Sequence, residues 1–122
     1  MSPSRIQRRR TRGWRMPQGA VYVGRPSVWG NPYAIQRYGR VTWEVEGFGV
    51  LLQTFYSRTG REARAYAVDR LAHLLAEGRA PWSVDMIRRE LAGHDLACWC
   101  PLDQPCHADL LLDIANAKEE GR

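Results

Sequence analysis

All three cysteines of the chain and one of its three histidines lie between residues 98 and 107. Within LACWCPLDQPCHADLLLDIAN (residues 96–116), Cys98 and Cys100 form a C-x-C pair, and Cys106 and His107 are adjacent. Thiolates and imidazoles are common ligands of zinc, and a thiolate is also the nucleophile of cysteine-dependent reactions. The residue types therefore predict either a metal site or a reactive thiol.

The expected elements allow these four side chains to meet. Residues 95–100 are typical of a strand, in which alternate side chains share a face, so Cys98 and Cys100 point the same way. The turn PLDQP then leads into a helix from about Cys106 to Ala117. The strand thiols can approach the first residues of this helix across the turn.

Three interpretations of the cysteine segment stay open. In the first, the three thiols and the imidazole form a Cys3His set for tetrahedral zinc or iron, although its spacing is tighter than in standard zinc knuckles. In the second, Cys106 is a reactive thiol or anion-facing residue at a helix N-terminus, with His107 and Asp109 as acid/base or orienting groups. In the third, the thiols only fill the space at a tight junction between the strand and the helix. The metal ligands of the first interpretation are Cys98, Cys100, Cys106 and His107.

A second stretch, GRPSVWGNPY (residues 24–33), contains residues that a simple loop does not need. Its glycines permit close backbone approach, and its arginine offers a planar fork for phosphate or carboxylate. The serine and asparagine add neutral donors, and the tryptophan gives a flat face for stacking, unless it only fills the core. The candidate ligand-binding residues are Gly24, Arg25, Ser27, Trp29, Gly30 and Asn31.

Both motifs follow the carboxyl end of a predicted strand, since GAVYVGR (residues 19–25) is expected to contain a strand that leads into the loop. Ligands of open α/β sheets bind at that end of the strands. If the two strands are parallel neighbours, the arginine, tryptophan and asparagine of the loop face Cys106 and His107 across one crevice.

Together, VYVGRPSVWGNPY and the cysteine segment resemble a small bacterial and phage family, domain of unknown function 4326. The resemblance extends from about Val21 to Asn116 and is loosest at 41–60. The family pattern is a GRPS-x-WGNP loop followed by C-x-C and a CH-x-D ending. It corresponds here to Gly24, Arg25, Pro26, Ser27, Trp29, Gly30, Asn31, Pro32, Cys98, Cys100, Cys106, His107 and Asp109. The family name carries no reaction, so the resemblance strengthens the site and leaves its chemistry open.

The net charge of +5 is concentrated at the N-terminus, outside that family pattern. Six arginines lie within the first 15 residues, where there is no acidic residue, which leaves 12 of the 18 Lys and Arg against 13 Asp and Glu in the rest of the chain. We expect residues 1–17 to be a flexible arm that contacts phosphate groups of nucleic acid, with a merely solvated leader as the alternative. The arginines of the arm are Arg5, Arg8, Arg9, Arg10, Arg12 and Arg15.

Residues 18–122 are expected to form one small α/β domain. We predict a mixed sheet of three to five strands, about three helices and Rossmann-like strand–loop–helix units. The TGRE sequence at 59–62 has the capping-box pattern, and Ser83 is a candidate cap for a second helix. The expected elements before the cysteine segment are a strand near 21–23, a hairpin of 41–46 and 50–56, and helices from 59 to 78 and from 83 to 93.

No apolar run has the roughly 18 residues that a membrane span requires, and the N-terminus lacks the apolar region of a signal peptide. Three cysteines cannot form a complete disulfide framework. We therefore expect a cytoplasmic protein, in the host cytoplasm if it is encoded by a phage, without a membrane partner.

The leading hypothesis is a domain that binds or processes a nucleotide or a nucleic-acid end in the crevice. If it is an enzyme, a transferase or hydrolase acting on nucleotides or nucleic acid is the favoured class. One alternative is a non-enzymatic accessory protein that binds nucleic acid and is stapled by a Cys3His metal, with zinc as the possible cofactor. A further alternative is a phage accessory protein that binds a host protein.

Overall fold

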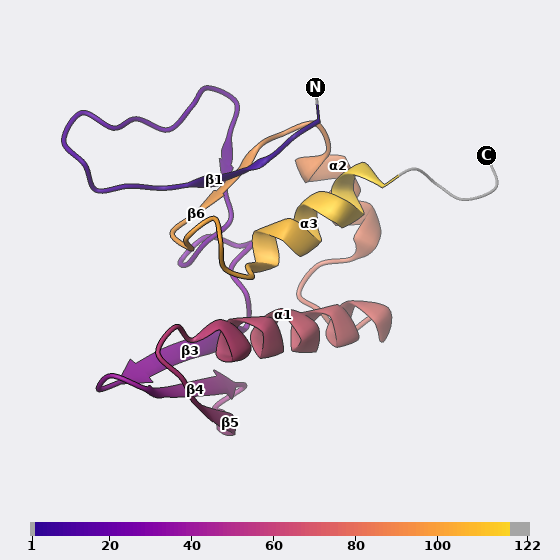
Figure 1. Cartoon of the computed structure of the whole chain (residues 1–122). Coiled ribbons are helices and arrows are strands. Elements are labelled where there is room, and N and C mark those ends of the chain that lie inside the picture. Colours follow the sequence, from indigo (N-terminus) through magenta and orange to yellow (C-terminus); the bar gives the residue numbers. More distant parts are fainter. Residues whose placement is uncertain (1, 118–122) are drawn as a thin grey trace.

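The strands divide between two three-stranded sheets in the computed structural model, which describes residues 2–117 (Figure 1). The parallel sheet has the order β1-β6-β2, formed by Arg5–Gln7, Leu96–Cys98 and Val21–Tyr22. The antiparallel sheet has the order β3-β4-β5, formed by Tyr33–Tyr38, Thr42–Gly47 and Val50–Tyr56. The helices of the described residues are α1 (Arg61–Ala76), α2 (Val84–Leu91) and α3 (His107–Asn116). The predicted α/β class with three helices is confirmed, but two sheets replace the single mixed sheet.

Helix α1 lies between the antiparallel sheet and the layer that contains α3 and the parallel sheet (Figure 1). Its buried residues recur every three or four positions and are Ala63, Ala67, Leu71 and Leu74. The inner face of β4 supplies Trp43 and Val45 to the same core. No helix in the described range 2–117 combines the length and apolarity that crossing a bilayer requires.

Strand β1 corrects the expectation of an unstructured arm. Arg5–Gln7 pairs in parallel with β6, with Arg5 opposite Leu96, and the amide of Arg8 continues the ladder by donating to Cys98 O at 2.7 Å. Every residue of β6 is buried, so this strand needs a hydrogen-bonded neighbour on each side. The strand is only three residues long, Arg-Ile-Gln, which is too short to show the alternation of apolar and polar side chains by which a strand is predicted.

The antiparallel sheet confirms the predicted hairpin and adds a strand that the sequence did not reveal. β4 and β5 pair as expected, and β3 runs beside β4 with Ile35 opposite Val45. The second half of β3 is exposed and polar, and its start follows directly on the loop signals of Asn31 and Pro32. Because Asn31 and Pro32 are typical of a loop, the sequence did not predict that a strand begins directly after them.

The two predicted helix caps have different outcomes. Ser83 caps α2, since its Oγ accepts a hydrogen bond from the Met86 amide at 3.0 Å. The capping box at Thr59 is wrong, because the residue that caps α1 is Gly60, with φ of 70° and no side-chain cap. A Cβ at this position would lie 2.6 Å from the indole of Trp43, so close packing and a left-handed backbone both require glycine there.

Candidate functional site

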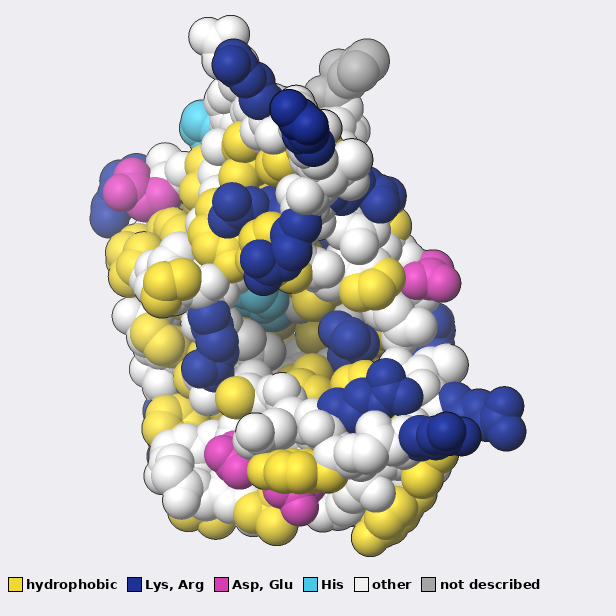
Figure 2. All heavy atoms as spheres, turned by 90° about the vertical axis from the view of Figure 1, so that its left-hand side faces the viewer, with side chains coloured by type: hydrophobic (Ala, Val, Ile, Leu, Met, Phe, Trp, Pro, Cys, Tyr) yellow, Lys and Arg dark blue, Asp and Glu magenta, His cyan; other side chains and the backbone are white. Residues whose placement is uncertain are grey.

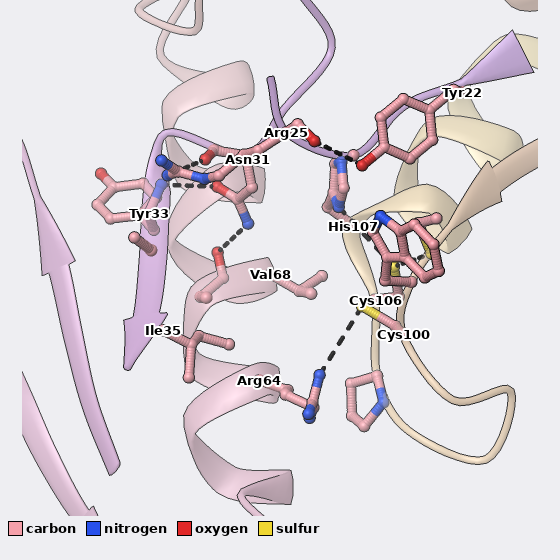
Figure 3. A pocket seen from close by; sticks show the side chains of 16 residues that line it. Tyr22, Arg25, Asn31, Tyr33, Ile35, Arg64, Val68, Cys100, Cys106 and His107 are labelled. Atoms are coloured by element: carbon pink, nitrogen blue, oxygen red, sulfur yellow. Dashed lines mark hydrogen bonds between the residues drawn. The ribbon is translucent and has the colours of Figure 1, made fainter. Parts of the chain in front are cut away.

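Strands β2 and β6 are parallel neighbours, with Val21 opposite Leu96 and Tyr22 opposite Ala97. Their carboxyl ends therefore lie together, and so do the GRPSVWGNP loop and the cysteine turn that follow them. A crevice of about 370 Å³ lies between these segments (Figure 3). The predicted juxtaposition of the two motifs is confirmed.

Each wall of the crevice comes from a different part of the fold. On one side are the loop after β2, the start of β3 and the middle of α1, which contribute Arg25, Asn31, Tyr33, Ala34, Ile35, Arg64, Ala67 and Val68. On the other side are the end of β2, the turn after β6 and the start of α3, which contribute Tyr22, Trp99, Pro105, the three cysteines and His107. Figure 3 shows Arg64 reaching from α1 across the crevice toward Cys100.

The three thiols converge at one end of the crevice. The sulfur atoms of Cys98, Cys100 and Cys106 all lie within 4.8 Å of one another, and those of Cys98 and Cys106 are 3.1 Å apart. Cys98 and Cys106 are only 2% and 3% exposed, whereas Cys100 is partly exposed. Strand alternation and the PLDQP turn thus bring the thiols together as predicted.

The thiols of this cluster differ in acidity. Hydrogen bonds from the Cys106 and Cys98 thiols lower the pKa of Cys100, and the positive charges of Arg64 and Arg5 act in the same direction. The same hydrogen bonds raise the pKa of Cys106, together with burial. These shifts favour Cys100 over Cys106 as the thiol that ionises first, whereas the sequence favoured Cys106.

Cys106 also differs from its expected place in the helix. It is the N-cap of α3, with φ of −150° and ψ of 144°, so the helix begins at His107. Its thiol points into the cluster and not toward solvent. Cys106 is therefore a buried member of the cluster, and its predicted role as a reactive thiol stays a prediction.

His107 ties three segments together. Its Nε2 lies 2.8 Å from Val23 O and 3.1 Å from Trp29 O, and because carbonyls only accept, Nε2 carries the proton. Burial lowers the pKa of the imidazole, so the ring is neutral and Nδ1 has a lone pair, 3.8 Å from the Cys106 sulfur. The histidine thus holds the end of β2 and the loop against α3, and it lies outside the group of three sulfurs.

Asp109 does not line the crevice. Its carboxylate forms a salt bridge with Arg5, with Oδ1 3.1 Å from Nε. The same guanidinium donates through Nη2 to Leu102 O and Gln104 O, at 2.8 and 2.9 Å. The Arg5 side chain is only 7% exposed, so this arginine is part of the folded domain and not of an open nucleic-acid arm.

The loop residues divide between the crevice and the core. Trp29 is 6% exposed and packs on Trp82 with ring centroids 5.4 Å apart, so its face is not open for stacking. Asn31 binds the protein itself, donating to Ala67 O and accepting from the Tyr33 amide. Ser27 accepts from the Trp29 amide and lies outside the main crevice.

The two glycines of the loop have tight surroundings. A Cβ at Gly24 would lie 2.6 Å from the Tyr22 hydroxyl, and one at Gly30 would lie 3.1 Å from the Arg25 side chain. Arg25 itself is exposed, lines the crevice, and donates to Asn31 O at 2.6 Å. Of the predicted ligand-binding side chains, Arg25 is therefore the charged one, and it lines the crevice.

Arg64 is the main lining residue that the sequence reasoning missed. Its Nη1 donates to the Cys100 sulfur at 3.8 Å, and its guanidinium also lies over Trp43. The sequence held one indication of this position. Arg64 and Val68 are four residues apart, so they lie on the same edge of α1, beside its apolar stripe, and this edge faces the crevice. An isolated arginine on a helix with many charges does not stand out without the fold.

The comparison with protein families confirms the resemblance to a known family. A family described as "Domain of unknown function (DUF4326)" matches residues 6–117. The chain belongs to this family. Neither a curated protein nor a solved structure matches the chain. The DUF4326 match begins within β1, so it includes most of the arginine-rich segment, which the sequence motifs had placed outside the family.

In this DUF4326 chain, part of that segment packs at the mouth of the crevice. The guanidinium of Arg8 lies 4.6 Å from the centroid of the Tyr22 ring and 4.8 Å from that of Trp99, and Arg10 lies 4.6 Å from Trp99. Figure 2 shows arginine side chains around a hollow on this face of the molecule. The arginines of the arm thus extend the positive charge of the crevice outward.

Proposed function

We propose that this DUF4326 domain binds a nucleotide, either free or at the end of a nucleic-acid strand, in the crevice. The observation that carries the proposal is the charge of the walls. Arg25 and Arg64 come from different elements, and no carboxylate is among the described residues that line the crevice. Two guanidiniums in a cavity whose lining includes no carboxylate favour an anionic ligand such as phosphate.

The remaining surface suits the aromatic part of a nucleotide. Tyr22, Tyr33 and Trp99 line the crevice together with aliphatic side chains; Tyr33 is only 8% exposed, whereas Trp99 is 38% exposed and offers more open aromatic surface. The volume of about 370 Å³ is within the usual range for small-ligand sites, about 300 to 1,000 Å³. Aromatic faces provide stacking that tolerates any base.

The rim supports a ligand with more than one phosphate. Arg8 and Arg10 stack on aromatic rings at the mouth, and Arg9, Arg12 and Arg15 follow in exposed positions. A strand end held in the crevice would leave its next phosphates beside these arginines. Each phosphate that they neutralise releases counterions, which adds affinity at low salt.

Calorimetric titration of the full chain with nucleoside 5′-monophosphates, and with short single strands carrying a 5′-phosphate or a 5′-hydroxyl, tests the proposal. We expect binding of the monophosphates and weaker binding of the strands that lack the terminal phosphate. The variant Arg64→Gln should lose about ten- to a hundred-fold in affinity, as expected for a charge-assisted hydrogen bond.

The matched control is Arg89→Gln, which removes the same charge from an exposed position on α2, away from the crevice. Its affinity should equal that of the unmodified chain. Absence of binding to every monophosphate and strand, or an equal loss in both variants, would overturn the proposal.

A further inference from the structure

The geometry of the cysteine cluster matches that of a metal centre. Zinc–sulfur bonds of about 2.3 Å place two sulfurs on a tetrahedral ion about 3.8 Å apart. The three sulfurs of the cluster lie within 4.8 Å of one another, with the shortest separation 3.1 Å. Small side-chain shifts therefore suffice to place an ion between them.

The donor set narrows the choice of ion. The group of three contains only sulfur, and thiolates select zinc, copper(I) or iron over magnesium and calcium. In the sequence, the close C-x-C and C-H spacings argued against a four-ligand site. This objection does not apply to three ligands, because the strand end supplies Cys98 and Cys100 and the N-cap of α3 supplies Cys106. The backbone therefore does not have to fold around the ion as it does in a zinc knuckle.

The fourth coordination position has no protein ligand among the described residues. The Nδ1 lone pair of His107 lies 3.8 Å from the Cys106 sulfur but outside the group of mutually close ligand atoms, and no other histidine, aspartate or glutamate of the described residues joins that group. All three cysteines line the crevice, so an ion held by them borders that cavity. Metal sites with three protein ligands and one open position are those that contact substrates or water.

Two guanidiniums balance the charge of such a centre. Zinc with three thiolates carries a net charge of −1, and Arg64 Nη1 lies 3.8 Å from the Cys100 sulfur. Arg5 interacts electrostatically with Cys98 and Cys106, and its Nη1 is buried without a hydrogen-bond partner. Donors around the sulfurs are the usual outer shell of a thiolate metal site.

We propose that Cys98, Cys100 and Cys106 bind one zinc ion as thiolates, with the fourth coordination position open to the crevice. Three Zn–S bonds form on binding as water ligands leave the hydrated ion, and the protons of the broken S–H bonds pass to the buffer. A water remains at the open position, and an oxygen of the bound nucleotide displaces it. This last step rests on the proposed function, whereas the metal site does not.

Elemental analysis of the full chain, purified with a phosphine reductant and without chelator, tests the metal site. We expect about one zinc per chain. Replacement by cobalt(II) should give sulfur-to-cobalt charge-transfer absorption that weakens in Cys98→Ser, Cys100→Ser and Cys106→Ser. A chain without zinc that gives no such absorption with cobalt overturns the metal site, and this result does not depend on how the serine variants fold.

The open position is tested with His107→Gln and with imidazole. Glutamine places an amide donor near the position of Nε2 and removes Nδ1, so it keeps the contacts to Val23 and Trp29 but cannot ligate through a ring nitrogen. The visible cobalt bands should be unchanged in this variant and should shift on adding imidazole. Bands that change in the variant and do not respond to imidazole overturn the open position in favour of Cys3His.

Nucleoside monophosphates are the final addition to the cobalt-loaded chain. A shift of the bands at saturating nucleotide supports both proposals. A chain that binds cobalt and responds to imidazole, but neither binds nor responds to nucleotides, supports the metal site and overturns the proposed function. The two failures are therefore distinguishable.

Discussion

Arg5 and Asp109 form an ion pair, with Nε 3.1 Å from Oδ1, that joins the first strand of the chain to its last described helix. The sequence suggested a nucleic-acid contact for Arg5 and a catalytic role for Asp109. The ion pair instead gives both residues a part in holding β1 against α3, beside the buried cysteine cluster. This contact places the start of the chain within the architecture of the site.

Replacing Arg5 should destabilise the domain more than replacing its partner. Arg5→Met removes two hydrogen bonds from a buried guanidinium to Leu102 O and Gln104 O, so we expect a loss of about 3 kcal/mol in the free energy of unfolding. Asp109→Asn removes a half-exposed carboxylate, and its loss should be about 1 kcal/mol or less. Urea denaturation of the two variants measures the difference. Equal losses, or a larger loss for Asp109→Asn, would contradict this role of Arg5.

Variants of His107 test whether this residue stabilises the fold or contacts the ligand. His107→Leu leaves Val23 O and Trp29 O without their donor in a buried place, which should cost about 2 to 4 kcal/mol in unfolding free energy. His107→Gln keeps a donor and should remain within about 1 kcal/mol of the unmodified chain. Thermal and urea unfolding provide the comparison.

The outcome distinguishes two roles of the histidine. If His107→Gln is as stable as the unmodified chain and binds nucleotides with the same affinity, the imidazole serves to position the loop. A large loss of nucleotide affinity in a stable His107→Gln chain would instead assign the ring a direct contact with the ligand.

The sequence revealed the segments of the candidate site because the rules that bring them together act over short stretches of the chain. Strand alternation puts Cys98 and Cys100 on one face, and a short turn returns the chain to Cys106, so convergence of the thiols follows from spacing alone. The meeting of the two motifs depended on one assumption, that β2 and β6 are parallel neighbours, and it is confirmed.

The features that the sequence did not reveal depend on tertiary contacts. Arg5–Gln7 becomes a strand because the buried β6 needs a second neighbour, and nothing in its own three residues requires this. Trp29 looks suited to stacking but fills the core, because Trp82 from a distant segment packs on its ring. Gly60 displaces Thr59 as the cap of α1 because the indole of Trp43 occupies the space that a side chain would need.

The exposed part of the arm should affect nucleic-acid strands and not mononucleotides. Arg9 and Arg12 are exposed and do not line the crevice. Replacing both with glutamine should reduce the slope of log K against log salt by about 1.4 for a 5′-phosphorylated oligonucleotide, since each phosphate contact on a single strand contributes about 0.7. Titrations at several salt concentrations measure this slope.

The control for the arm is the double replacement Arg79→Gln and Arg89→Gln, which removes two exposed charges elsewhere. It should leave the slope unchanged. If the affinity for monophosphates falls together with that for the oligonucleotide in the arm variant, the arm acts on the crevice itself and the extended path along the rim is wrong.

The order in which the cysteines react separates the metal site from a reactive Cys106. With zinc bound, all three thiols should react slowly with iodoacetamide, because their lone pairs are engaged by the ion. After removal of the metal by a chelator, Cys100 should react first, since it is partly exposed and lies 3.8 Å from Arg64 Nη1, whereas Cys98 and Cys106 are buried. Timed alkylation followed by fragment-ion mass spectrometry locates the label. A first reaction at Cys106, with or without zinc, would return that thiol to the role of nucleophile and would contradict the arrangement in which its sulfur is shielded by the cluster.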